Sequence, residues 1–536
     1  MMNMRARNYL DLLLLQRSYK GLARRTNPLS LWPRSLRGLQ LVAACCCHTT
    51  TAAAVGCLPE RPRCGGKEGT GFNIGYQTPS VGAASMWEKL ARALRRLART
   101  LQLLLRALGI SLLLSTPVFP GSIVYVLHHL PGFPRGISTQ LCDWWWRLLL
   151  KVVDRSGPTF IKAIQWASTR QDTFPKDVCG RLAQLQTFTR ERPVKYGEDA
   201  LGVAFGETWR QFLKLEDGPL GSGCVASVYK GRLVAGDNTG RQIAVKILHG
   251  DVKKTIQLDL ELLRAAASFA EMLPFLRLKW LSLSEMVDEF ASLTEMQLDL
   301  RKEATNLERF AKDFEDDATV VFPQPVHPWI TENVLLEDWI TAEPISKFFN
   351  EGTSKKLAEI GLQTFLKMVF INNFVHGDLH PGNLLVSRRE DNGEPCLVFI
   401  DAGIVCTLDE VDRENFCALF HAVVVGDGKL AGSLMIERGR EQQCTDPEAF
   451  CAGVDELVQR ARSSGLRLGQ IQAGELLSRM FRLCVKHEVK LEPKFARILI
   501  AIAVLEGVGR SLDPECNILA ASLPVVLEAT SMMAAK

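Results

Sequence analysis

Two short polar strings in the C-terminal half constrain this chain more than any other feature. The first is His376-Gly377-Asp378-Leu379-His380-Pro381-Gly382-Asn383, and the second is Val398-Phe399-Ile400-Asp401-Ala402-Gly403. The residues between them predict two strands, Leu384–Val386 and Leu397–Ile400, joined by a turn at Asp391-Asn392-Gly393. A hairpin of this kind brings the ends of both strings back to the same place.

The polar side chains of the two strings are those that phosphoryl transfer requires. Asp378 is placed to accept a hydroxyl proton or to orient the nucleophile. Asn383 and Asp401 are placed to hold the Mg²⁺ ions that neutralise the phosphates. The alternative is a buried loop whose polar residues only cap turns. We favour a kinase-like site, in which Asp378 is catalytic and Asn383 and Asp401 are metal ligands.

The remainder of a nucleotide site is predicted upstream. A loop of mostly small residues would let backbone N–H groups approach phosphates; it comprises Gly221, Ser222, Gly223, Cys224, Val225, Ala226, Ser227 and Val228. The strand Gln242–Leu248 follows and carries Lys246, which in such a site pairs with the α/β-phosphates and with a helix glutamate. A third strand, Val334–Leu336, places the adenine hinge near Glu337-Asp338-Trp339.

From about Ser156 to Pro524 the sequence resembles the aarF-domain-containing (UbiB-like) atypical kinases. The His-Gly-Asp-Leu-His-Pro-Gly-Asn string is one of the motifs that carry the resemblance. Gly157-Pro158-Thr159-Phe160-Ile161-Lys162-Ala163-Ile164-Gln165 is similar to the Lys-x-Gly-Gln signature of that family. Leu298-Asp299-Leu300-Arg301-Lys302-Glu303-Ala304 is similar to its Glu-x-Asp…Glu-Ala helix.

The resemblance implies an α+β, atypical protein-kinase-like fold with a small β-rich N-lobe, a mostly helical C-lobe and family-specific N-terminal helices. It also implies that Glu303 is the helix partner of Lys246 and that Lys162 and Gln165 reach into the nucleotide site. The implied cofactors are ATP and Mg²⁺. The implied partners are a lipid or quinone-like small molecule, the mitochondrial membrane and proteins of quinone biosynthesis, and the implied role is in coenzyme Q homeostasis.

The chain departs from the family pattern at two positions of interest. Ile164 replaces the glycine of Lys-x-Gly-Gln, and a β-branched side chain there is expected to hold the segment off the nucleotide site. In the alternative, residues 157–170 form a packed helix with Ile164 in its core. Gln297 replaces the glutamate of Glu-x-Asp, so a charge pair with Lys162 becomes at best a hydrogen bond. We also expect one long amphipathic helix from Ser282 to Phe310.

Two absences bear on the phosphoryl acceptor. Gly377 stands where ordinary protein kinases have the arginine of His-Arg-Asp, so a phosphorylated activation loop has no such partner. No Ala-Pro-Glu string follows Asp401, and the platform that presents a peptide is therefore predicted to be missing. A small molecule, a lipid or water is a better acceptor than a protein chain, although a protein acceptor stays open.

Charge divides the chain into a basic N-terminal part and a mildly acidic body. Residues 1–100 carry 16 Lys and Arg against 4 Asp and Glu, whereas the remainder carries 48 against 55. The acid-poor composition of residues 1–59 is typical of a mitochondrial targeting segment, with Arg5 to Arg25 as an amphipathic helix; a disordered basic tail is the alternative. The body has no basic stripe, which argues against a nucleic-acid partner. The 15 cysteines include no CxxC pair and indicate reduced thiols.

The predicted domain order follows from these features. Residues 60–100 form a basic linker or amphipathic segment, and residues 101–130 form a hydrophobic membrane-associated segment. Within the latter, Ala107–Leu127 carries no charge over 21 residues, which is long enough to cross a bilayer, although Pro117 and Pro120 would kink or break a spanning helix. An interfacial helix pair or a helix docked on the kinase core are the alternatives.

Residues 156–536 form the kinase-like domain, with the N-lobe and its inserted helices at 156–340 and the C-lobe at 341–536. After Asp401 we expect helices at Asp409–Val425, Asp446–Arg462, Ala473–Val489 and Pro493–Gly509. Two functional classes remain: an ATP-dependent atypical kinase or ATPase of the mitochondrial membrane, and a nucleotide-gated lipid-binding or scaffold protein with little or no catalysis.

Overall fold

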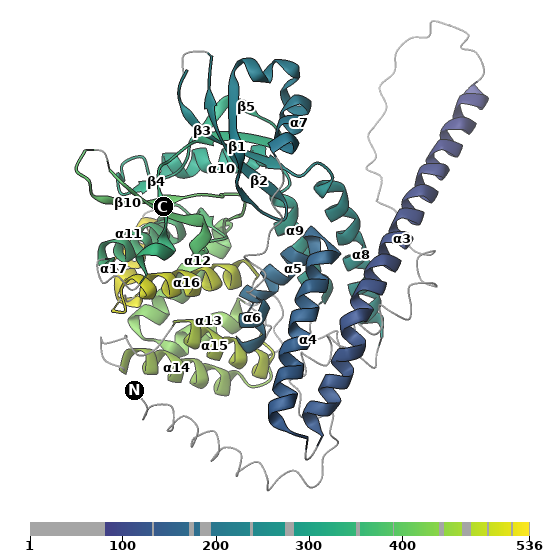
Figure 1. The fold of residues 1–536 in the computed structure, drawn as a ribbon. Coiled ribbons are helices and arrows are strands. Elements are labelled where there is room, and N and C mark those ends of the chain that lie inside the picture. The colour runs from purple at the N-terminus through teal and green to yellow at the C-terminus, as the bar shows by residue number, and fades with distance from the viewer. Residues whose placement is uncertain are drawn as a thin grey trace, which may run out of the picture. The chain divides into compact units, whose positions relative to one another are not determined.

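The computed structural model places the chain in two compact units, one of residues 1–130 with 268–283 and one of residues 131–267 with 284–536 (Figure 1). It describes residues 81–130, 133–170, 176–182, 194–235, 239–273, 283–349, 354–389, 391–438, 444–463, 473–489, 493–515 and 518–534. The predicted targeting segment, 1–59, and residues 60–80 of the predicted linker lie outside these ranges. Their assignments stay predictions.

In the first unit, helix α3 runs without interruption over Val81–His129 and includes both Pro117 and Pro120. The expectation that these prolines break the helix is wrong. Pro117 has no N–H to donate to the carbonyl of Leu113, but the hydroxyl of Thr116 donates to that oxygen at 2.7 Å. The segment Glu88–His129 is long and apolar enough to cross a membrane, and it contains an 18-residue window with a mean hydropathy of 1.8.

The N-lobe is built on a five-stranded antiparallel sheet of order β1-β2-β3-β6-β5. Its strands are β1 (Leu213–Ser222), β2 (Ala226–Leu233), β3 (Gln242–Leu248), β5 (Pro325–Ile330) and β6 (Val334–Asp338). Helix α7 (Val194–Phe205) and the short turn η3 (Glu207–Gln211) cover one face and close a core around Tyr229, Ile243 and Val245. The predicted strand Gln242–Leu248 is confirmed to the residue.

Three helices connect β3 to the rest of the sheet: α8 (Val252–Met272), α9 (Leu283–Met296) and α10 (Leu300–Asp313). The single long helix expected over Ser282–Phe310 is wrong. The helix is interrupted at Gln297–Asp299, where the Asp299 side chain accepts a hydrogen bond from Arg301 N and caps α10. The break is fixed from outside the segment as well, because Leu300 N donates to Glu332 O at 3.0 Å.

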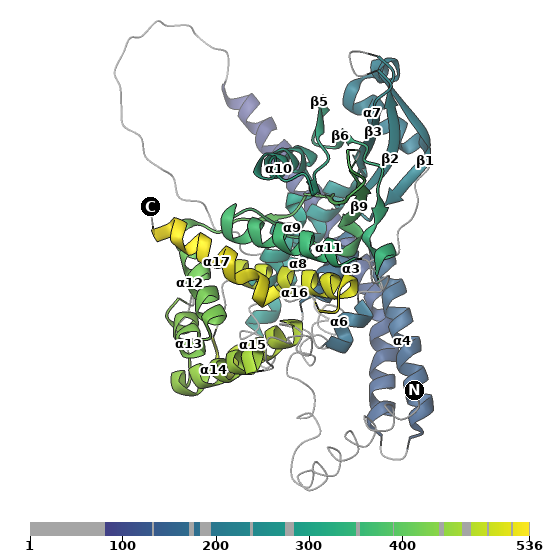
Figure 2. The same ribbon diagram turned by 90° about the vertical axis from the view of Figure 1, so that its left-hand side faces the viewer.

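The C-lobe combines a small sheet with a helical bundle (Figure 2). The sheet has the order β4-β10-β9-β7, with β4 at Val320–Val321, β7 at Glu343–Pro344, β9 at Leu384–Arg388 and β10 at Pro395–Phe399. A separate antiparallel pair is formed by β8 (Val375–His376) and β11 (Val405–Cys406). The helices are α11 (Lys355–Leu366), α12 (Glu410–Val425), α13 (Gly428–Glu437), α14 (Pro447–Ser463), α15 (Ala473–His487), α16 (Pro493–Leu512) and α17 (Ile518–Ala534). All four predicted helices after Asp401 are present.

Three further helices precede the N-lobe sheet: α4 (Arg135–Ser156), α5 (Pro158–Thr169) and α6 (Lys176–Leu182). Ile164, on α5, packs in a small cluster with Trp146 and Leu150 of α4, Val178 and Leu182 of α6, and Ala167. The segment 157–170 therefore contains a packed helix. Ile164 contacts the neighbouring helices, which was the alternative expectation for this residue.

Candidate active site

Lys246 lies at the centre of a charge cluster that joins three separate parts of the chain, in which Lys246 and Glu303 are largely buried and Asp401 is partly exposed. Its Nζ is 2.7 Å from Oε1 of Glu303 and 3.1 Å from Oδ1 of Asp401. Lys246 comes from β3, between β2 and β6, and Glu303 comes from the first turn of α10. The structure thus brings together the lysine, the helix glutamate and the Asp-x-Gly aspartate that the sequence placed 57 and 155 residues apart.

The electrostatics of this cluster follow from burial opposed by opposite charge. Burial alone would lower the pKa of Lys246, but the carboxylates of Asp401 and Glu303 outweigh it and raise that pKa above its usual range. Burial raises the pKa of Glu303 to about 6 despite the nearby lysine. Burial also acts to raise the pKa of Asp401, but Lys246 and Lys162 overcome it and hold that pKa below its usual range. Asp401 is therefore the fixed anion of the cluster.

Asp401 adopts a left-handed backbone conformation, with φ of +59°. Such a conformation is uncommon for a residue with a side chain, although Asp and Asn tolerate it best, and it often marks a functional position. Gly403 follows where space is limited, since a Cβ at this position would lie 3.2 Å from Asp401 Oδ1 and 3.7 Å from Glu303 Oε2. Asn306, one helical turn after Glu303, fixes the same loop by donating to Ala402 O at 2.8 Å.

Asn383 and Asp378 lie next to each other at the base of the hairpin. Asn383 Nδ2 donates to the backbone oxygen of Asp378 at 2.9 Å, which leaves the Asn383 side-chain oxygen for another partner. The hairpin itself matches the prediction, because β9 and β10 pair antiparallel and Gly393 has a φ of +68° in the connecting turn. The hairpin therefore holds Asn383 at its beginning and delivers Asp401 just after its end.

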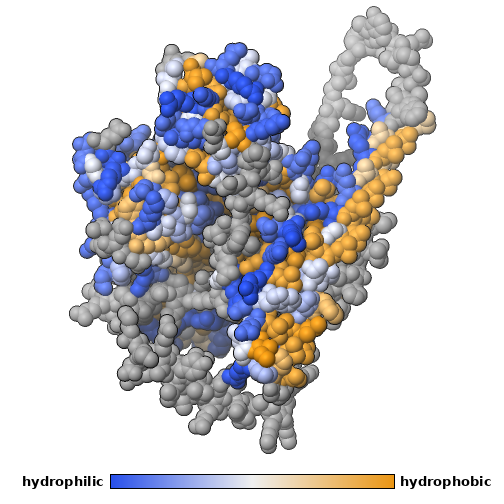
Figure 3. Space-filling view, in the orientation of Figure 1, coloured by the Kyte–Doolittle hydropathy of each residue, from blue (hydrophilic) through white to orange (hydrophobic). Residues whose placement is uncertain are grey.

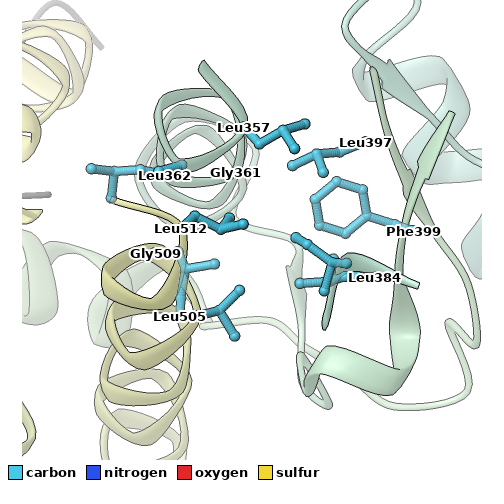
Figure 4. Close-up of a pocket in the computed structure, with 12 residues that line it drawn as sticks. Leu357, Gly361, Leu362, Leu384, Leu397, Phe399, Leu505, Gly509 and Leu512 are labelled. Carbon is cyan, nitrogen blue, oxygen red and sulfur yellow. The ribbon is translucent and has the colours of Figure 1, made fainter. Parts of the chain in front are cut away.

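Apolar packing anchors the hairpin just beyond these polar residues (Figure 4). Leu384, which follows Asn383, and Phe399, two residues before Asp401, point into a small apolar hollow. The other walls come from α11 and α16, including Leu357, Gly361, Leu505 and Leu512. Burial of these side chains fixes the hairpin to the helical bundle, so the positions of both candidate metal ligands depend on the C-lobe core.

His376 positions the backbone of Asp378. It is fully buried, its Nε2 lies 3.2 Å from Ile400 O, and its Nδ1 accepts a hydrogen bond from Asp378 N. Burial lowers the pKa of His376, which favours the neutral ring that can accept at Nδ1. Gly377 is the only residue type that fits between them, because a Cβ there would lie 2.8 Å from Ile404 Cγ2. Packing thus explains why no arginine stands in this place.

The predicted phosphate loop divides between two strands. Gly221 and Ser222 end β1, Ala226 to Val228 begin β2, and the turn itself is Gly223–Val225, closed by Gly223 N donating to Ala226 O at 2.7 Å. The two serine hydroxyls point inward. Ser222 Oγ and Ser227 Oγ are 3.0 Å apart, and Ser227 Oγ is 3.1 Å from His249 Nε2. These hydrogen bonds join the two strands that flank the turn and connect them to His249. Burial raises the pKa of the thiol of Cys224, within this turn.

Lys162 of α5 reaches the edge of the charge cluster. Its Nζ donates to Oε1 of Gln297, and Gln297 lies against the Asp401–Gly403 loop, because a Cβ at Gly403 would be 3.5 Å from Gln297 Cγ. The predicted weakening of the charge pair to a hydrogen bond is what the structure has. The expectation that Ile164 would hold this segment away is wrong, since Ile164 faces α4 and α6 while Lys162 faces the site. Among the described residues, the side chain of Gln165 has no hydrogen bond to the cluster.

A buried carboxyl group, Glu337, was not predicted as a site side chain. Its side chain has an exposed fraction of 8%. Burial, and then the charge of Glu303, raise the pKa of Glu337 to about 8. Its place in the site follows from strand register, which the sequence pattern does not give: Ala244 lies opposite Glu337 in the β3–β6 pair, and Lys246 lies opposite Leu335.

The donor set suits Mg²⁺ bound with a nucleotide. Magnesium prefers hard oxygen ligands and usually takes one or two from the protein and the rest from phosphates and water. Asp401 offers a carboxylate, and Asn383 offers an amide oxygen because its nitrogen is already committed. Lys246 supplies the cationic charge that phosphate oxygens require. ATP and Mg²⁺ therefore fit the residues that are present.

Comparison with known proteins identifies the family to which this arrangement belongs. The ABC1 atypical kinase-like domain matches residues 184–434, and the UbiB helical domain matches residues 460–517. A mitochondrial ABC1 family protein of Saccharomyces cerevisiae is 32% identical over 72% of this chain and 68% of its own length. The chain belongs to the ABC1 atypical kinase-like family. The two-lobed kinase-like fold predicted from sequence is confirmed.

Other ABC1 family members give the same picture across distant organisms. A mitochondrial ABC1 family protein of Schizosaccharomyces pombe is 30% identical over 74% of this chain and 67% of its own length. A protein of Azotobacter vinelandii named as the probable protein kinase UbiB is 29% identical over 81% of this chain and 80% of its own length. The UbiB helical domain includes α15 and α16. Leu505 and Leu512 of α16 line the hollow that packs against the hairpin of the site.

Proposed function

We propose that this chain binds Mg²⁺–ATP at the Lys246 cluster and transfers the γ-phosphoryl group to a small-molecule or lipid acceptor, or to water. The observation that carries the proposal is the contact of Lys246 with both Glu303 and Asp401, at 2.7 and 3.1 Å. These contacts join the phosphate-binding lysine to the residue that would hold the metal.

Each residue has a separate task in this scheme. Lys246 and the backbone of the Gly223–Val225 turn would bind the phosphates, while Asp401 and Asn383 would hold Mg²⁺, whose charge neutralises the phosphate oxygens. Asp378 would orient the attacking hydroxyl or water and take up its proton. His376 keeps Asp378 in place through its backbone N–H, 3.2 Å away. Lys162 adds a second positive charge beside Asp401.

We further propose that the protein works at a mitochondrial membrane in lipid and quinone homeostasis, including coenzyme Q, with proteins of quinone biosynthesis as partners. The mitochondrial names of the two yeast relatives support the compartment. The exposed leucines of α3 support the membrane (Figure 3); they include Leu90, Leu94, Leu97, Leu101, Leu105, Leu108 and Leu112. Four arginines, Arg92, Arg95, Arg96 and Arg99, lie on the same helix and favour an anionic lipid surface.

The apolar face of α3 also favours a second candidate function. In it the protein binds or moves a lipid, ATP binding acts as the switch, and hydrolysis is slow or absent. The two functions differ in the fate of ATP. In the first, ATP is converted to ADP as its γ-phosphoryl group passes to an acceptor or to water. In the second, ATP is bound and is hydrolysed slowly or not at all.

The test is ATP turnover by the full-length protein with Mg²⁺, with and without liposomes that contain anionic lipid and a quinone-like lipid. The enzyme proposal expects ADP formation that the lipids stimulate and that Asp378→Asn removes. Nucleotide-dependent liposome binding without ADP formation would select the second function. N-terminal sequencing of the mitochondrial protein tests the targeting segment: retention of Met1 on a cytosolic protein would contradict the proposed compartment.

A further inference from the structure

One carboxyl oxygen in the N-lobe is buried without a hydrogen-bond partner. Oε2 of Glu337 has no partner among the described residues, although the side chain is more than nine-tenths buried. A polar atom left unsatisfied in the interior is destabilising and is rare in native proteins. A bound ligand that donates a hydrogen bond to this oxygen would satisfy it.

Strand register places this oxygen on the nucleotide face of the sheet. In an antiparallel pair, directly opposed residues have their side chains on one face, and residues two apart on a strand share a face. Glu337 lies opposite Ala244, and Ala244 is two residues from Lys246. Glu337 therefore shares the face of the phosphate-binding lysine. Its electrostatic neighbours agree, since they include Glu303, Lys246 and Asp401.

Glu337 nevertheless lies beyond the phosphate end of this face. The ion pairs of Lys246 within 4 Å, in the part of the chain that the structure describes, are with Glu303 and Asp401 and do not include Glu337. The Gly223–Val225 turn lies at the opposite end of β3, where Ala226 pairs with Leu248. A nucleotide whose phosphates lie between that turn and Lys246 would direct its base toward Ala244 and Glu337. The small side chain of Ala244 would take up little of the space that a flat ring needs there.

We propose that Glu337 determines which base this site accepts, by accepting a hydrogen bond at Oε2 from the exocyclic amine of adenine. The inference rests on the proposed function, because it requires a nucleotide at the Lys246 cluster. The amine is a donor with two hydrogens, and a carboxyl oxygen with unused lone pairs is its natural partner. A purine without that amine would leave Oε2 unsatisfied, so the pair should favour adenine by about tenfold.

The experiment compares two nucleotides that differ only in this amine. Affinities of the full-length protein for ATP and for purine riboside triphosphate, both with Mg²⁺, are measured by calorimetry on the wild type and on two variants. Glu337→Met removes the acceptor with little change of shape, and Glu337→Gln keeps a carbonyl oxygen in its place. Glu337→Leu replaces the methionine variant if that one does not fold. Glu359→Gln, at an exposed position of α11, is the control.

We expect the wild type, Glu337→Gln and Glu359→Gln to bind ATP about tenfold more tightly than purine riboside triphosphate. In Glu337→Met the ratio should fall to about one, through loss of ATP affinity. An unchanged ratio in Glu337→Met overturns the inference, and so does an equal loss for both nucleotides, which would mean that Glu337 acts through Lys246. Failure of the wild type to bind either nucleotide would overturn the proposed function itself.

Discussion

Lys162 of α5 donates a hydrogen bond to the side-chain oxygen of Gln297, in the short break between α9 and α10. This contact fastens a helix from the start of the kinase-like unit to the loop that carries Asp401 and Gly403. The contact is present despite both departures from the family pattern. Gln297 still accepts the hydrogen bond, and Ile164 lies on a different face of α5 from Lys162. The residue at position 164 therefore affects packing of α5 and leaves its polar contact unchanged.

Ile164→Gly should lower stability without changing nucleotide affinity. The substitution removes a side chain from the cluster with Trp146 and Val178 and adds a glycine to the middle of α5. Because Ile164 is only half-buried, we expect a loss of about 2 kcal/mol in the free energy of unfolding. Urea denaturation and ATP titration of the same variant test this. A changed ATP affinity at unchanged stability would restore the view that residue 164 restrains the site.

Lys246→Met should destabilise the protein more than a variant that also removes its partner. At pH 8 the single change leaves the buried Glu303 beside the partly exposed Asp401 without the lysine that contacts both, and breaking a buried ion pair in this way typically costs about 3–5 kcal/mol. Lys246→Met combined with Glu303→Gln relieves part of that repulsion. Urea denaturation of both single variants and the double variant, without nucleotide, measures the coupling between the two residues. Additive losses would mean that the 2.7 Å contact contributes no coupling.

Asp401→Asn should abolish the stabilisation of the protein by Mg²⁺–ATP. The change replaces an anionic ligand with an amide, while Asn tolerates the left-handed backbone at this position. The readout is the shift in melting temperature on adding Mg²⁺–ATP, compared with the shift for Asp391→Asn in the exposed hairpin turn. Equal shifts in wild type and Asp401→Asn would remove Asp401 from the metal site.

Asp378→Asn should keep the Mg²⁺–ATP shift but reduce ATP turnover by about 100-fold or more, because a general base acts on the nucleophile and not on the phosphates. The matched readouts are melting temperature and ADP formation on the same preparation. Turnover equal to that of the wild type would point to a contaminating ATPase or to a different base.

The parts of the site that are local in sequence were predictable. The hairpin from Asn383 to Asp401 is bounded by a turn signal and by apolar strands, and β3 is a short apolar run that carries its own lysine. Each can be recognised within a window of about twenty residues. The structure departs from the predicted strands by two residues at most.

The remaining features depend on partners that are distant or that oppose local propensity. The break before α10 looks polar and helical in sequence, but Leu300 N finds Glu332 O and the helix restarts there. In α3, which continues through Pro117, the hydroxyl of Thr116 donates to the Leu113 carbonyl that the proline cannot reach. The orientation of Glu337 depends on the register of β6 against β3. Neither composition nor periodicity contains these pairings.

The wild type should lose stability relative to Glu337→Gln as the pH rises from 5 to 9 without nucleotide and Mg²⁺. Burial and the charge of Glu303 raise the pKa of Glu337 to about 8 in the folded protein, against an ordinary value near 4.5 when unfolded. The folded state thus binds this proton more tightly, so the contribution of the proton to the free energy of unfolding is complete below about pH 4.5 and is lost as the pH passes about 8.

Glutamine cannot ionise, and Glu303 is present in both proteins. We expect the free energies of unfolding to diverge by at least about 1 kcal/mol by pH 9, measured in urea, whereas Glu359→Gln on the exposed side of α11 should follow the wild type. Parallel curves for the wild type and Glu337→Gln would show that Glu337 ionises normally in the folded protein.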